Sequence, residues 1–286
     1  MDDFSNVIAT IQKGFGKELI NKIFGAVSTV YNDSDYINTK RAKHQIMKEI
    51  SEDARWSALE RYAIVDNIDT ISKQFANVLD ICKRAGEIMN QSDRAKDYNN
   101  LDEEWVAKFK ECSKNASSDN IRQMWAKLLA ERVENNKGIT KSLLNTLSLL
   151  ESYQAKCFTT VSAFRLILND GDEQRVCVIF PHDIINKYFD YVTFDTLVEL
   201  DNLGLIRYSH IGRAIIKRKM IHGIWENRKI SIANKDDIPE IVLGKINLTH
   251  SGETLASIIA ETVDEKIFVD VIGEYCQKCH YDFQIE

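Results

Sequence analysis

The chain has 286 residues, of which 44% are hydrophobic and 28% are charged, and its formal net charge is −6. These proportions are typical of a folded globular protein and exclude a disordered chain, and no apolar run of about eighteen residues predicts a membrane-spanning helix. The negative net charge excludes phosphate binding by the molecule as a whole, so any affinity for nucleic acid has to come from a local basic patch.

The N-terminal sequence and the cysteines predict a cytoplasmic protein. The chain opens with Met-Asp-Asp-Phe, and no short apolar core with a cleavage site follows, as an export signal would require. Without export, the six cysteines are expected to be reduced thiols. Four of them lie in apolar sequence and are interpreted as core residues: Cys82, Cys112, Cys157 and Cys177.

The first 180 residues contain no proline, which favours long helices because proline in a helix interior costs about 3 kcal/mol. Apolar residues at helical intervals predict an amphipathic helix within residues 6–31. We interpret this helix as packed on the rest of the protein, the alternative being contact with a membrane or a partner. Residues 35–89 then predict a long helical hairpin.

The second half of this hairpin carries a heptad repeat of about three and a half heptads, which has to be buried against another helix. Two partners could cover this seam: the preceding helix around Ile46 and Ile50, which we favour, and a second copy of the chain. The residues that would form an oligomer seam are Ile64, Ile68, Ile71, Phe75 and Val78.

Residues 90–100 are polar and are interpreted as a linker, after which Asp102 is expected to cap a short helix. Trp105 and Trp125 fall on apolar helical stripes and are interpreted as core residues. Further helices are predicted over residues 121–133, 140–150 and 154–168.

After residue 169 the pattern becomes mixed. Residues 175–180 are rich in β-formers, Thr193 is expected to cap a helix, and Gly204 is expected to end it in the left-handed conformation before a strand. The fold prediction is therefore mainly α. It comprises an N-terminal long-helix region with a helical hairpin or bundle (1–100), a central helical domain (101–168) and a C-terminal α+β winged-helix-like domain (169–286).

Several segments carry a family resemblance. They are Asn67-Ile-Asp-Thr-Ile71, Asp102-Glu-Glu-Trp-Val-Ala-Lys-Phe109, Gln123-Met-Trp-Ala-Lys-Leu-Leu-Ala-Glu131, Leu203-Gly-Leu-Ile206 and Leu248-Thr-x-x-Gly252-x-x-Leu255. Over about residues 60–260 the chain resembles an uncharacterised bacterial family catalogued as domain of unknown function 2806. That family tends to carry a Pro-Gly-Ser turn after the third segment, whereas Asn135-Asn-Lys-Gly138 keeps only the glycine. The resemblance implies no catalytic residue, and loose analogy with abortive-infection proteins suggests phage defence.

No catalytic motif is complete. A phosphate-binding loop, a Gly-x-Ser-x-Gly elbow and a His-Glu-x-x-His helix are all missing from the sequence. Cys276-Gln-Lys-Cys279-His280 matches a haem-attachment pattern, but attachment needs export, and a zinc site would need further ligands. We therefore expect no cofactor and no metal, and the sequence favours a protein that is not an enzyme.

Residues 207–229 form a basic segment with seven basic residues and only Glu226 as an acid. Such a segment suits phosphate contacts, and an aromatic side chain within it could stack on a base. However, the preceding predicted helix carries Asp195, Glu199 and Asp201, which phosphates would repel. The candidate residues for nucleic acid or an acidic protein partner are Arg207, Arg213, Lys217, Arg218, Lys219, Trp225, Arg228 and Lys229.

Two functional hypotheses follow. The first is a non-enzymatic helical regulatory or scaffold protein that acts through contacts with a protein partner or with further copies of itself. The alternative is a nucleic-acid-binding module that uses a basic wing at residues 207–229.

Overall fold

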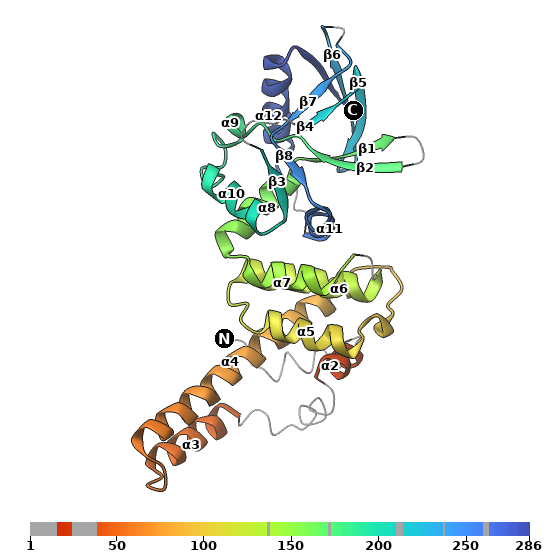
Figure 1. The fold of residues 1–286 in the computed structure, drawn as a ribbon. Coiled ribbons are helices and arrows are strands. Elements are labelled where there is room, and N and C mark those ends of the chain that lie inside the picture. Colours follow the sequence, from red (N-terminus) through yellow and green to blue (C-terminus); the bar gives the residue numbers. More distant parts are fainter. Residues whose placement is uncertain are drawn as a thin grey trace. The chain divides into compact units, whose positions relative to one another are not determined.

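The computed structural model describes residues 16–24, 39–135, 138–170, 173–209, 214–236, 238–259 and 263–286. The chain divides into two compact units, Met1–Ser148 (the N-terminal unit) and Leu149–Glu286 (the C-terminal unit) (Figure 1). The described residues are mainly helical, and their strands lie in the C-terminal unit and pair antiparallel. The mainly α prediction is thereby confirmed. Whether residues 1–100 and 101–168 fold as separate domains stays a prediction.

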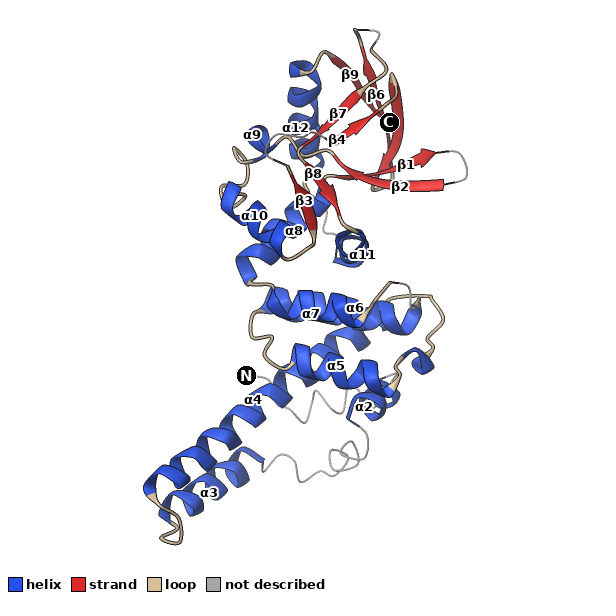
Figure 2. Cartoon of the chain, viewed as in Figure 1, coloured by secondary structure: helices blue, strands red, loops and turns tan. Residues whose placement is uncertain are grey.

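Helices build the N-terminal unit (Figure 2). They are α2 (Gly16–Phe24), α3 (Thr39–Glu52), α4 (Ala58–Asn90), the 3-10 helix η3 (Tyr98–Asn100), α5 (Glu103–Ser113), α6 (Asp119–Glu134) and α7 (Lys141–Leu149). α3 and α4 form the predicted hairpin. In the part of the chain that the structure describes, no helix combines the length and apolarity needed to span a bilayer.

The core of this unit lies between α4, α5 and α6. Trp105 and Trp125 are almost fully buried, and the ring of Phe109 lies 5.2 Å from the first and 5.5 Å from the second. Trp105 Nε1 donates a hydrogen bond to the carbonyl of Ile139 at 3.1 Å, so its one polar group is satisfied. The interpretation of both tryptophans as core residues is confirmed.

The polar segment 90–100 belongs to the same unit and is not a linker between compact units. The ring of Tyr98 is buried, the backbone N–H of Asp97 donates to the carbonyl of Val133 at 3.0 Å, and the Asn100 amide donates to the same carbonyl at 3.2 Å. The linker interpretation was wrong because these polar groups satisfy the C-terminal end of α6 rather than water.

The C-terminal unit is a mixture of helices and short strands. In chain order it contains α8 (Ser152–Ala163), β1 (Arg165–Asp170), β2 (Glu173–Val178), α9 (His182–Ile185), α10 (Phe194–Asn202), β3 (Ile206–Tyr208), β4 (Ala214–Ile216), β5 (Met220–Trp225), β6 (Arg228–Asn234), β7 (Ile241–Gly244), β8 (Ile246–Leu248), α11 (His250–Ile259), α12 (Glu265–Lys278) and β9 (Tyr281–Ile285). The strand order of the main sheet is β2-β1-β5-β6-β9, and β3-β8 and β4-β7 form separate pairs.

The predicted helix over residues 154–168 is too long. α8 ends at Ala163, and the residues that follow form β1, which pairs with β2 from Arg165 opposite Val178 to Asp170 opposite Glu173. Leu166 and Leu168 are buried at an interval of two residues, the spacing of one face of a strand. A short apolar run satisfies either period, and the pairing of β1 with β2 and with the distant strand β5 decides between them.

The basic segment 207–229 does not form one wing. It runs through β3, β4, β5 and the start of β6, and these strands have different partners: β3 pairs with β8, β4 with β7, and β5 with β6. Of its basic residues in the described ranges, Arg207 lies on β3, residues 217–219 lie in the β4–β5 turn, and Arg228 and Lys229 lie at the start of β6.

Candidate functional site

The turn between α3 and α4 and the first turns of α4 carry three exposed large apolar side chains. Leu59 is 78% exposed, Tyr62 72% and Trp56 45%. Leu59 and Tyr62 are three residues apart and so lie on one side of α4, and Trp56 precedes them in the turn. We call these three residues the hairpin tip.

The predicted seam on α4 is covered at one end only. Val78 is buried, and Phe75 is half-buried with its ring 4.7 Å from the ring of Phe24. Ile64 and Ile68 are half-buried, whereas Ile71 is 63% exposed. α3 packs on α4 but leaves Ile71 in contact with solvent, so the favoured intrachain occupant covers only part of the seam.

Polar contacts hold the hairpin in one conformation. The ammonium groups of Lys43 and Lys73 lie 2.8 Å and 2.6 Å from the Asp69 carboxylate and lower its pKa to about 2. A capping box begins α4: the backbone N–H of Glu60 donates to Ser57 Oγ, and the Glu60 carboxylate accepts from the backbone N–H of Ser57 at 2.9 Å. The tip side chains therefore project from a preformed backbone.

The structure does not bring the basic candidates together. Arg207 lies 3.4 Å from Asp201, and Arg228 lies 2.7 Å from Glu265, so both are committed to ion pairs. Lys229 is exposed where β6 begins, paired opposite Ile224, at the other end of β5 from the β4–β5 turn. That turn holds the contiguous, exposed side chains of Lys217, Arg218 and Lys219, whereas Arg213 lies outside the described residues.

Trp225 is a core residue and cannot stack on a base in this structure. Its side chain is 3% exposed, its ring stacks on Phe268 at 3.8 Å, and its Nε1 donates to the carbonyl of Ala163 at 2.8 Å. The selection of Trp225 as a binding residue was wrong because β5 alternates, and its interior face carries Ile221, Gly223 and Trp225.

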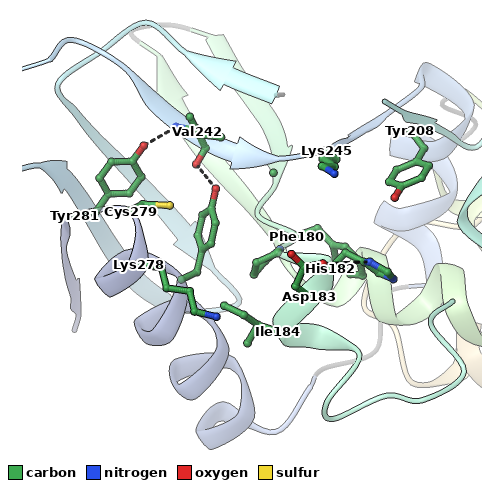
Figure 3. Close-up of a pocket in the computed structure, with 13 residues that line it drawn as sticks. Phe180, His182, Asp183, Ile184, Tyr208, Val242, Lys245, Lys278, Cys279 and Tyr281 are labelled. Atoms are coloured by element: carbon green, nitrogen blue, oxygen red, sulfur yellow. Dashed lines mark hydrogen bonds and ion pairs between the residues drawn. The ribbon is translucent and has the colours of Figure 1, made fainter. Parts of the chain in front are cut away.

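A pocket that the sequence did not indicate lies within the C-terminal unit (Figure 3). Its volume is about 440 Å³, and it is lined by residues 180–184, Tyr208, Val242, residues 244–245, Tyr275, residues 278–279 and Tyr281. The Tyr275 hydroxyl donates to the carbonyl of Val242 at 3.1 Å, and the backbone N–H of Val242 donates to the Tyr281 hydroxyl at 3.0 Å. These segments are far apart in sequence, so only the fold assembles the pocket.

The Cys-x-x-Cys-His segment forms the end of α12. Cys276 is buried, and burial raises the pKa of its thiol to about 12, whereas Cys279 is half-buried and lines the pocket. Within the described ranges, no group of three or more His, Cys, Asp and Glu residues is arranged to hold a metal ion.

The comparison with protein families finds a match. The model described as "Protein of unknown function (DUF2806)" matches residues 67–272. The matched region begins within α4, beyond the hairpin tip, and ends within α12, before Tyr275. No curated protein and no solved structure matches the chain.

Proposed function

Because the chain belongs to the DUF2806 family of proteins of unknown function, which supplies no reaction to assign, we propose that it is a non-enzymatic adaptor acting through protein–protein contacts of its α3–α4 hairpin. The observation that carries this proposal is the hairpin tip, where Trp56, Leu59 and Tyr62 are exposed on a preformed backbone.

The tip has the chemistry of a protein-binding surface. Tryptophan and tyrosine are enriched among the residues that dominate binding energy, and burying apolar area stabilises a complex by about 25 cal/mol per Å². The capping box and the Lys43–Asp69 ion pair order the hairpin before a partner arrives, which lowers the entropy cost of binding.

The partner that fits is an apolar helical surface. Side chains three residues apart on a helix form ridges that pack into the grooves of another helix, and the exposed Ile71 in the middle of the seam offers the same kind of contact. A second copy of the chain and a different helical protein both satisfy this geometry. We place the adaptor in the cytoplasm, in keeping with six cysteines that are not paired in disulfides, and a role in phage defence stays a prediction.

A photo-crosslinking amino acid at position 62 is expected to trap the partner in the native host. Substituting Trp56 and Leu59 together with alanine should then reduce the yield of this crosslinked species by about tenfold or more, because the tip would lose its apolar contact area. The measurement is the yield of the crosslinked band, with mass spectrometry to identify the trapped chain. A band containing only this protein, together with a dimer in light scattering, identifies the second copy.

Tyr188 supplies the matched control. It is also an exposed tyrosine, 42% accessible, but lies in the C-terminal unit. Crosslinking from position 188 should not yield the same species. The proposal fails if position 62 gives no crosslink that position 188 lacks, or if the Trp56→Ala, Leu59→Ala variant keeps the full yield.

Nucleic-acid binding is the second candidate, favoured by the exposed Lys217-Arg218-Lys219 turn. The order of α10, β3 and the paired strand β8 is compatible with a winged-helix-like arrangement, which we keep as part of this candidate. The carboxylates of α10 argue against insertion of this helix into a DNA groove. One of them, Glu199, accepts hydrogen bonds from the Tyr153 hydroxyl at 2.7 Å and the Gln154 amide at 2.9 Å.

Reversing Lys217, Arg218 and Lys219 to glutamate is expected to weaken binding to duplex DNA strongly. If three phosphate contacts are lost, the slope of log affinity against log salt should fall in magnitude by about 2.7. Fluorescence anisotropy with a labelled duplex at several salt concentrations measures both quantities. Affinity that is unchanged after the reversal would remove this candidate, as would the absence of binding by the unmodified protein at low salt.

A further inference from the structure

The pocket of the C-terminal unit has a rigid floor. Gly244 has a φ of +124°, and a Cβ at this position would lie 2.6 Å from the carbonyl oxygen of Phe180. The backbone N–H of Phe180 donates to the carbonyl of Leu243 at 3.0 Å, which ties the two segments together. A glycine is therefore required where β7 crosses Phe180, and the close approach fixes the floor.

The opposite wall is fixed by two tyrosines. Tyr275 on α12 and Tyr281 on β9 both bond to the backbone of Val242, one through its carbonyl and the other through its N–H. Figure 3 shows the Tyr281 ring beside Val242 and Lys278 extending from α12 toward Ile184. Together with Phe180 and Tyr208, these two tyrosines make four Phe and Tyr residues among the thirteen that line the pocket.

Two lysines, Lys245 and Lys278, and one carboxylate, that of Asp183, belong to the lining itself. Lys278 and Lys187 share the single carboxylate of Glu274, at 2.8 Å and 2.7 Å, so the three groups keep a net positive charge. Lys245 is exposed at the pocket, and no ion pair involves it among the residues that the structure describes. Asp183 is the carboxylate of the lining itself, and its side chain is almost fully exposed to solvent.

We propose that this pocket binds a small organic anion that carries an aromatic ring and is about the size of a mononucleotide. The volume of about 440 Å³ falls within the range of roughly 300–1,000 Å³ that small-molecule sites occupy. Aromatic walls accept a planar ring, and lysines bind phosphate or carboxylate as point charges. The inference concerns the C-terminal unit and does not rest on the adaptor function of the hairpin.

Cys279 provides a reporter inside the pocket, since its thiol is half-buried in the lining. The full-length protein is treated with iodoacetamide, and alkylation of the peptide containing Cys279 is followed by mass spectrometry. The probes are AMP and UMP as aromatic phosphates, 4-hydroxybenzoate as an aromatic carboxylate, and inorganic phosphate and benzyl alcohol as the separate halves. At least one probe that combines a ring and an anion is expected to slow alkylation, with a Kd below about 1 mM.

Lys245→Glu is expected to weaken that protection about tenfold or more, the effect of losing a charge-assisted hydrogen bond. Lys266→Glu makes the same charge change on an exposed lysine at the start of α12, outside the pocket, and should leave protection unchanged. Because both lysines are exposed, both variants should keep the circular dichroism spectrum of the unmodified protein.

The proposal is overturned if no probe that combines a ring and an anion slows alkylation of Cys279. It is also overturned if such a probe slows alkylation as much in the Lys245→Glu variant as in the unmodified protein, or if inorganic phosphate slows it as much as AMP and UMP do. Protection by the mononucleotides but not by 4-hydroxybenzoate assigns the anionic group as phosphate, and the reverse assigns it as carboxylate. Either outcome supports the proposal.

Discussion

Replacing Trp225 with alanine is expected to lower the free energy of unfolding of the C-terminal unit by about 3–5 kcal/mol, the usual cost of truncating a buried tryptophan. The indole stacks on Phe268 at 3.8 Å, and its N–H is satisfied by the carbonyl of Ala163. Alanine would leave a cavity against Phe268 and an unpaired carbonyl at the end of α8. Urea denaturation followed by circular dichroism measures the loss.

Trp56→Ala is the matched control, because Trp56 is 45% exposed in the α3–α4 turn. Its substitution should change the free energy of unfolding by less than about 1 kcal/mol, since much of its surface is already in water. Equal effects of the two substitutions, or a Trp225→Ala variant as stable as the unmodified protein, would show that Trp225 is not the packed residue described above.

The burial of Trp225 shows why the function of the basic segment 207–229 is hard to predict from the sequence. Strand alternation places Ile221, Gly223 and Trp225 on the buried face of β5. This alternation is visible in the sequence once the strand and its register are known. The register, however, depends on pairing with β1 and β6, and no local pattern specifies which distant strand becomes the neighbour.

Local backbone chemistry was predictable. Asp102 accepts from the backbone N–H of Trp105 at 2.8 Å, Thr193 accepts from that of Thr196 at 3.2 Å, and Gly204 has a φ of +72°. Each feature depends on a few consecutive residues, so the sequence contains all the information that is needed.

The candidate sites were harder to predict from the sequence, because they depend on which side chains the fold leaves exposed. The heptad repeat indicated a seam, but nothing in it shows that Val78 is covered while Ile71 stays open. The pocket joins Phe180, Val242 and Tyr281, which the sequence separates by up to a hundred residues. Only long-range strand pairing places them together.

Gly252→Ala is expected to destabilise the C-terminal unit by about 3 kcal/mol, at the upper end of the usual cost of overpacking. A Cβ on Gly252 would lie 1.8 Å from the carbonyl oxygen of Leu205 and 2.9 Å from its carbon. This backbone is held in place: the Thr249 N–H donates to the Leu205 carbonyl at 3.1 Å, and Thr249 Oγ1 donates to that of Gly204 at 2.6 Å. Relief of the clash would have to separate α11 from the start of β3, which urea denaturation would detect.

Gly86→Ala provides a control of opposite sign. Gly86 lies inside α4, and no atom lies within 4 Å of a Cβ built there. Alanine should therefore stabilise the N-terminal unit by about 0.5–1 kcal/mol, because it restricts the unfolded chain and favours the helix. If Gly252→Ala stabilised the protein as Gly86→Ala is expected to, helix propensity rather than the Leu205 contact would govern position 252. That result would contradict the close contact of α11 with the Leu205 carbonyl at the start of β3.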